Sequence, residues 1–153
     1  MYVRPIMEYN TCTWSPYLKS EIELAESVQR KFTRLLCQKA NISFTSYNHR
    51  LAKLNLQSLQ SRRIKNDLIL LYKILNNLVD MQYTENFKLS NFGHNLRRHT
   101  KHLVRRRQPK TLCCENFFAV RVIQHWNKLP ANVVTSPTLS IFKQRIQQIN
   151  FNI

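Results

Sequence analysis

Residues 116–130, NFFAVRVIQHWNKLP, place apolar and basic side chains on opposite sides of a predicted helix. The apolar side chains recur every three to four residues, as neighbours on one helix face do. They are Phe118, Val122, Trp126 and Leu129. The opposite side carries Arg121, Gln124 and Lys128. Pro130 ends the helix, because proline disfavours helical geometry at the residue before it. The stretch therefore predicts a helix with an aromatic packing face beside a cationic one.

The chain is strongly basic for its size. Its 153 residues suit one domain with a real core, and a hydrophobic fraction of 43% argues against full disorder. A formal net charge of +16 favours polyanionic partners, nucleic acid first and an anionic membrane second. Residues 1–87 hold 12 basic and 7 acidic side chains, whereas residues 88–153 hold 12 basic ones and only Glu115. We therefore expect the second half to meet the polyanion more strongly.

Composition excludes several classes of protein. A lone glycine, Gly93, argues against hairpin-rich β architectures, which need turns with positive φ. No apolar run reaches ~18 residues, so no membrane span is expected, and residues 1–9 do not resemble a secretory signal. The cysteines lack C-x-x-C spacing, which favours reduced thiols and a nuclear or cytoplasmic protein. They are Cys12, Cys37, Cys113 and Cys114.

Two helices are predicted before residue 55. The first covers about residues 21–38 and starts at a capping box of Ser20 and Glu23. Glu26 and Arg30 form an i,i+4 pair on it. Its expected buried stripe is Ile22, Ala25, Val28, Phe32, Leu35 and Leu36. The second is short, over residues 46–54.

The longest helix is expected over about residues 58–79 and, being apolar on a broad face, at the centre of a bundle. Arg62, Arg63 and Lys65 crowd its first turns, where the helix dipole disfavours cations. An external anion is a plausible compensation, with Asp67 neutralising part of the charge. A last amphipathic helix follows residues 136–137, a Ser-Pro pair read as its start.

Residues 80–110 are polar and irregular, with weak signals for short strands. Within them residues 94–110, HNLRRHTKHLVRRRQPK, form what we call the basic arm. Neutralising six or seven phosphates through this arm predicts a slope of about −5 to −6 for the logarithm of affinity against the logarithm of salt concentration. The same composition also suits a nuclear-import signal or a solvated tail.

These patterns predict an all-α fold, a small helical bundle with an irregular basic arm between the central helix and the C-terminal helices. We divide the chain into a helical bundle at residues 1–80, a basic linker at 81–112 and a C-terminal helical segment at 113–153 that packs on the bundle.

Several motifs together resemble the C-terminal portion of reverse transcriptases from non-LTR retrotransposons of the LINE and Jockey-like kind. The resemblance covers nearly the whole chain. It rests on R-P-x-x-E-Y at residues 4–9, W-S-P at 14–16, V-Q-R-x-F at 28–32, F-F-x-x-R-V at 117–122 and W-N-x-L-P at 126–130. R-R-x-x-D-L is met at residues 62–68 with one extra residue before the aspartate. The family often has an acidic residue where Asn48 and His49 stand.

In that family this region follows the polymerase palm and supplies the thumb, a helical element that grips the template–primer duplex, and a trailing segment. The resemblance therefore implies nucleic-acid handling rather than chemistry. Polymerisation needs clustered carboxylates that hold two divalent metals, and the aspartates here are only Asp67 and Asp80. We expect a truncated product that is not an enzyme, lacks the palm and needs no cofactor.

Other sites are less well supported. Cys113 and Cys114 beside the histidines of the arm invite a zinc site, but adjacent cysteines do not easily share one tetrahedral metal. Trp14 and Trp126 are able to stack on bases, although a tryptophan on an apolar helix stripe, such as Trp126, is usually core.

The expected ligand is RNA, DNA or their hybrid, bound through basic side chains. The predicted contacts are Arg30, Arg34, Arg62, Arg63, Arg97, Arg98, Lys101, Arg105, Arg106, Arg107, Lys110 and Arg121. Two alternatives stay open: an interaction module whose apolar faces bind a protein, the missing palm or a second copy, and an inert remnant of a retroelement.

Overall fold

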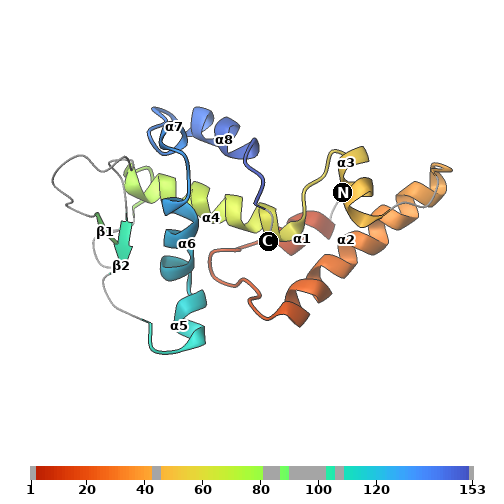
Figure 1. The fold of residues 1–153 in the computed structure, drawn as a ribbon, viewed down its shortest axis with the longest axis horizontal. Helices are drawn as coiled ribbons and strands as arrows, with labels where there is room; N and C mark the ends of the chain where they lie inside the picture. The colour runs from red at the N-terminus through yellow and green to blue at the C-terminus, as the bar shows by residue number, and fades with distance from the viewer. Residues whose placement is uncertain (1–2, 43–45, 81–86, 90–102, 106–108, 152–153) are drawn as a thin grey trace. The chain divides into compact units, whose positions relative to one another are not determined.

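The protein is helical, as predicted, with one short antiparallel pair of strands (Figure 1). The computed structural model describes residues 3–42, 46–80, 87–89, 103–105 and 109–151. They form two compact units, one within residues 3–63 and one within residues 64–151, so the division falls within helix α4 (Leu59–Leu75). Across these residues, no helix combines the length and apolar character that spanning a membrane requires. The predicted division at residues 80 and 112 stays a prediction.

The first unit contains α1 (Val3–Glu8), α2 (Lys19–Lys39), α3 (Tyr47–Lys53) and the start of α4. The predicted capping box at the start of α2 is wrong, because the helix begins at Lys19 with Leu18 as N-cap and no side-chain cap. Ser46 does cap α3, where its hydroxyl accepts a hydrogen bond from the His49 backbone N–H at 3.4 Å. At 21 residues α2, and not the 17-residue α4, is the longest described helix.

Helix α2 buries its polar face and exposes most of its apolar face, the reverse of the prediction. Its buried side chains are Glu26, Gln29, Thr33 and Cys37, all polar or small. Four members of the expected apolar stripe instead lie at the surface, among them Leu35 at 58% and Val28 at 38% exposed, while Ile22 and Ala25 are half-buried. Hydrogen-bond partners on α3 and α4 explain the inversion, since a buried polar face is stable when its groups are bonded.

Asparagine takes the place that glycine usually has at the ends of these helices. Asn10, Asn41, Asn55 and Asn77 have φ between 49° and 52°, the left-handed region. Asn41 N–H bonds to Gln38 O at 3.2 Å and Ile42 N–H to Cys37 O at 2.9 Å, which is a Schellman motif. The same pair of bonds closes α3 around Asn55 and α4 around Asn77. A chain with one glycine therefore still ends its helices sharply.

The second unit packs α6 (Phe118–Asn127), α7 (Ala131–Val134) and α8 (Leu139–Gln147) against the rest of α4 (Figure 1). Tyr72 stacks on Phe142 with ring centroids 4.3 Å apart, and Trp126 lies 6.0 Å from Phe142. The predicted core face of residues 116–130 is confirmed, with Trp126 fully buried. Its other members, Phe118, Val122 and Leu129, are buried too.

Two predicted helix boundaries shift in this unit. Helix α4 ends at Leu75, short of the predicted residue 79, because Asn77 reverses the chain. Helix α8 begins after Thr138, whose hydroxyl accepts from the Ile141 N–H at 3.3 Å, so the predicted Ser-Pro start at residues 136–137 is wrong. Ser136 is buried instead, and its backbone carbonyl accepts a hydrogen bond from Tyr72 at 2.7 Å.

Candidate nucleic-acid interface

The basic arm is attached to the second unit through a short strand. Strands β1 (Phe87–Leu89) and β2 (Leu103–Arg105) pair antiparallel, with Leu89 opposite Leu103 and Phe87 opposite Arg105. The Asn127 side chain accepts from Leu103 N–H at 3.1 Å and donates to Leu103 O at 2.8 Å. Its amide thus bonds to Leu103 as a neighbouring strand would. Leu103 is only 1% exposed and is held by these bonds. The arginines at 105–107 begin two residues after it in the sequence.

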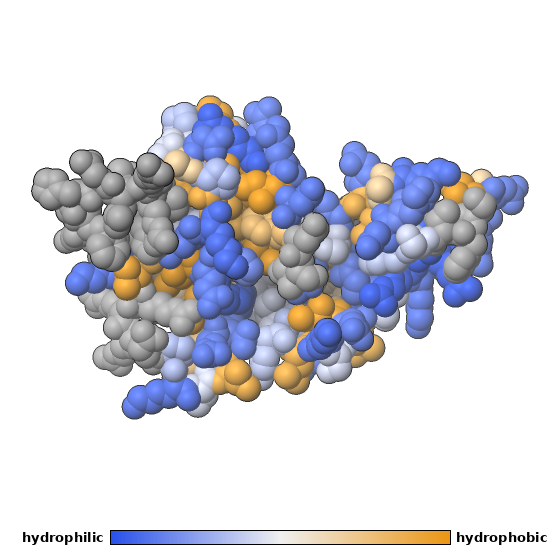
Figure 2. All heavy atoms as spheres, viewed as in Figure 1, coloured by the Kyte–Doolittle hydropathy of each residue, from blue (hydrophilic) through white to orange (hydrophobic). Residues whose placement is uncertain are grey.

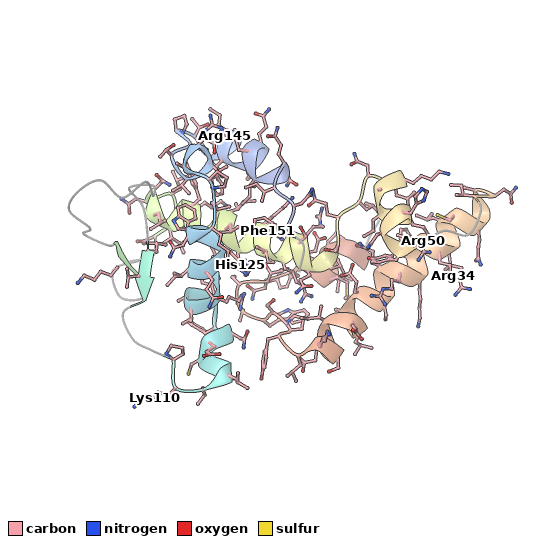
Figure 3. The ribbon with its side chains drawn as sticks, in the orientation of Figure 1. Arg34, Arg50, Lys110, His125, Arg145 and Phe151 are labelled. Carbon is pink, nitrogen blue, oxygen red and sulfur yellow. The ribbon has the colours of Figure 1, made fainter. Side chains whose placement is uncertain are left out.

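Most of the arm lies outside the described residues. This applies to Arg97, Arg98, Lys101, Arg106, Arg107 and the side chain of Arg105. At the end of the arm Lys110 is exposed and points away from α5 (Leu112–Asn116), as Figure 3 shows. The Thr111 hydroxyl caps α5 by accepting from Cys114 N–H at 3.3 Å. The role of these cations in binding stays a prediction.

On the first unit Arg30 and Arg34 lie on exposed positions of α2 (Figure 3 labels Arg34). The Arg30 guanidinium carbon lies 5.2 Å from the centroid of the Tyr47 ring, and that of Arg50 lies 5.7 Å from it. These cation–π contacts hold two positive charges beside one aromatic ring of α3. Arg30 keeps an exposed surface on this cluster, whereas Arg50 is buried.

Arg62 and Arg63 make contacts inside the first unit. Arg62 forms a two-bond ion pair with Glu8, in which Nη2 lies 2.6 Å from Oε2. Arg63 is 4% exposed, donates to Met7 O at 2.9 Å and lies over the Trp14 ring at 4.4 Å. The pairing supplies part of the anionic compensation that we had expected from outside the chain.

Arg121 has an acidic partner in the second unit. Its Nε donates to Asp67 Oδ2 at 3.0 Å and its Nη1 to Asn116 O at 2.8 Å. The two side chains are 16% and 7% exposed, so this is a largely buried ion pair. It joins α4 to α6, and Arg121 does not lie on the free cationic face that the sequence predicted.

Glu26 has a structural role that the sequence did not reveal. Rather than pairing with Arg30 at the surface, its buried carboxylate accepts hydrogen bonds from the Tyr47 hydroxyl and from Leu59 N–H, at 3.1 Å to Oε2. Leu59 is the first residue of α4, so this acid serves the positive end of that helix. Burial and the bond to Glu26 raise the pKa of the Tyr47 phenol well above its ordinary value. The sequence did contain a signal for this role: Glu26, Gln29 and Thr33 recur at spacings of three and four, which places three polar side chains on one face of the helix.

Among the described residues, His125 has a shifted pKa and two cations near it. His125 packs edge-on to Phe151, with centroids 6.2 Å apart (Figure 3). Burial, followed by the charges of Lys128 and Arg121, lowers the pKa of its imidazole below the ordinary 6.5. Over the part of the chain that the structure covers, His, Cys, Asp and Glu side chains nowhere gather in a group of three or more that could hold a metal ion.

Residues from the motifs that carry the resemblance meet one another in space. Glu8 pairs with Arg62, and Arg63 lies over Trp14, within the first unit. In the second unit Asp67 pairs with Arg121. R-R-x-x-D-L therefore contacts each of three other matched motifs, R-P-x-x-E-Y, W-S-P and F-F-x-x-R-V, and these side chains serve the fold.

Comparisons with known proteins give one limited similarity. No protein-family model and no solved structure matches the chain. An uncharacterized protein of Caenorhabditis elegans is 36% identical over 75 residues, which is 49% of this chain. The chain matches only 38% of that protein's length, so the similarity concerns a part of each.

Proposed function

We propose that this chain is a non-catalytic, thumb-like part of a non-LTR retrotransposon reverse transcriptase, an RNA-directed DNA polymerase, and that it binds template–primer nucleic acid. The proposal rests on the ordered motifs at residues 4–130 and on the formal net charge of +16. It assigns no chemistry to the chain. Asp67, one of its two aspartates, is tied to Arg121.

The observation that carries the proposal is the anchored start of the arginine run. Asn127 holds Leu103 by two hydrogen bonds, and three arginines lie at 105–107 immediately beyond. An anchored cationic segment loses less conformational freedom on binding than a free tail does. A duplex backbone offers such cations regularly spaced phosphates to contact.

Three of the predicted binding residues have roles inside the fold. Arg62, Arg63 and Arg121 already hold Glu8, Met7 and Asp67, so we assign them to the fold. We propose phosphate contacts for the arm with Lys110, and for Arg30 and Arg34, which lie on exposed positions of α2.

Charge substitutions in the arm test the proposal. Replacing Arg105, Arg106 and Arg107 together by glutamine should weaken binding to an RNA–DNA duplex and flatten the salt slope by ~2–3 units, since about three released counterions are lost. The matched control replaces the same arginines by lysine, which keeps the charge and should keep the slope. Filter binding over a salt series measures both. An unchanged slope in the glutamine variant would place phosphate contact elsewhere, with Arg30 and Arg34 as the next residues to replace.

A further inference from the structure

Among the described residues, helix α2 has an apolar face that stays partly or largely exposed. The polar face of Glu26, Gln29 and Thr33 is buried, while Leu24 is 72% exposed and Leu35 58% exposed. Phe32 at 36%, Val28 at 38% and Leu36 at 38% continue the same stripe. Figure 2 shows apolar side chains at the surface where α2 begins. An apolar stripe this long on a 21-residue helix is a feature of interaction sites.

The centre of this stripe has a heptad repeat. Its positions are Glu21, Ala25, Val28, Phe32, Leu35 and Lys39, at alternating spacings of four and three. Such a repeat forms the seam of a two-helix coiled coil. The positions of the repeat are also symmetric about residue 30, since they form the pairs 28/32, 25/35 and 21/39. The two inner pairs are apolar, and the outer pair joins an acid, Glu21, with a base, Lys39.

We propose that the stripe binds the α2 helix of a second copy of this chain, antiparallel, around a two-fold axis near residue 30. In that arrangement facing residue numbers add to 60, so Val28 faces Phe32 of the second copy and Ala25 faces Leu35. Glu21 faces Lys39 at both ends. Each contact occurs twice, as an isologous interface requires. Small residues thus face large ones, and opposite charges close the seam.

The sequence of the stripe selects a second copy over an unrelated partner. A parallel arrangement would place Glu21 beside Glu21 and Lys39 beside Lys39, and both like-charged pairs are unfavourable. The antiparallel arrangement removes both and pairs the same four side chains favourably. An unrelated apolar partner would have no need for this internal symmetry.

Self-association and nucleic-acid binding should respond to salt in opposite directions. Each chain carries +16, and the Lys31 side chains of the two copies approach beside the two-fold axis, so repulsion opposes the dimer at low salt. Salt screens this repulsion and favours the dimer, whereas it weakens phosphate contacts. The proposed dimer does not rest on the proposed function, so a result that contradicts one proposal leaves the other unaffected.

Sedimentation equilibrium of the full chain tests the apolar seam. In about 0.5 M salt, where repulsion is screened, we expect a monomer–dimer equilibrium at concentrations up to about 0.3 mM, since interfaces of one helix pair are weak. Leu35→Asp should raise the dimer Kd at least about tenfold, because it places a carboxylate in the seam. The matched control is Leu112→Asp on α5. Leu112 lies off the seam and is 67% exposed, compared with 58% for Leu35. It should leave Kd within about threefold.

Charge reversal tests the antiparallel pairing itself. In about 0.15 M salt, Glu21→Lys and Lys39→Glu should each raise Kd about fivefold, and the double variant should return it to near the unaltered value. Circular dichroism of every variant checks that helix content is kept. A chain that stays monomeric throughout would overturn the proposal. So would a dimer indifferent to Leu35→Asp, or a double variant as weak as either single one.

Discussion

At the scale of single residues, the buried carboxylate of Glu26 joins three segments of the first unit. It accepts hydrogen bonds from the Tyr47 hydroxyl on α3 and from Leu59 N–H at the start of α4. Gln29 adds bonds from α2 to Tyr47 at 3.1 Å and to Gln57 O at 2.9 Å. Few apolar contacts are buried on this side of α2, so the polar network supplies much of the specificity of packing.

Glu26→Gln should therefore destabilise the protein by about 1–3 kcal/mol, because the charged acceptor at the N-terminus of α4 is lost while its donors stay buried. Urea unfolding measures the change. Glu23→Gln, an exposed glutamate on the same helix, is the matched control and should stay within about 0.5 kcal/mol. Equal losses in the two variants would contradict the role assigned to Glu26.

His125 predicts how stability depends on acid. The pKa of His125 is lowered in the folded state, so the unfolded chain binds the proton more tightly. Protonation therefore stabilises the unfolded state relative to the folded one. The contribution of His125 is present above its ordinary pKa of 6.5 and is lost as pH falls below that value. His125→Gln should flatten the pH dependence of the unfolding free energy as the pH falls below 6.5. A titration followed by NMR with an imidazole pKa at or above the ordinary value would contradict this.

At the scale of elements, the ends of the helices depend on asparagine. Asn41, Asn55 and Asn77 each stand one residue beyond the C-cap of a helix in the left-handed conformation, and each closes a Schellman motif. The sequence contained the signal, because asparagine is the residue other than glycine that most readily takes this conformation. A low glycine content therefore argues against hairpins but not against sharply ended helices.

Asn55→Gly should keep or raise stability by up to about 1 kcal/mol, since glycine takes positive φ without a steric cost. Asn55→Val should lower it by about 1–2 kcal/mol, because a β-branched side chain clashes in the left-handed region. The midpoint of chemical denaturation orders the three proteins. If valine were tolerated as well as glycine, the left-handed turn after α3 would be in doubt.

Helix periodicity predicted the second unit better than the first. Phe118, Val122, Trp126 and Leu129 are buried as their spacing indicates, since an apolar stripe finds its partner in the core. The same reasoning was wrong for α2, whose apolar stripe is exposed and whose polar stripe is buried. Periodicity identifies the two faces of a helix, but the side that faces the protein depends on partners such as Tyr47 and Leu59, which are distant in the sequence.

At the scale of the whole molecule, positive charge exceeds what the fold itself uses. Glu8, Glu26 and Asp67 are bonded internally, two of them to arginine. The sequence predicted the surplus of cations, since net charge needs no structure to count. It did not predict which cations have an acidic partner in the chain, because the pairs Glu8–Arg62 and Asp67–Arg121 each join residues 54 apart.

The affinity of the whole chain for an RNA–DNA duplex, measured over a series of salt concentrations, tests the central claim most directly. We predict that the logarithm of affinity falls against the logarithm of salt concentration with a slope of about −5 to −6, as six or seven neutralised phosphates require. An affinity absent at low salt, or one that salt does not change, would contradict the claim.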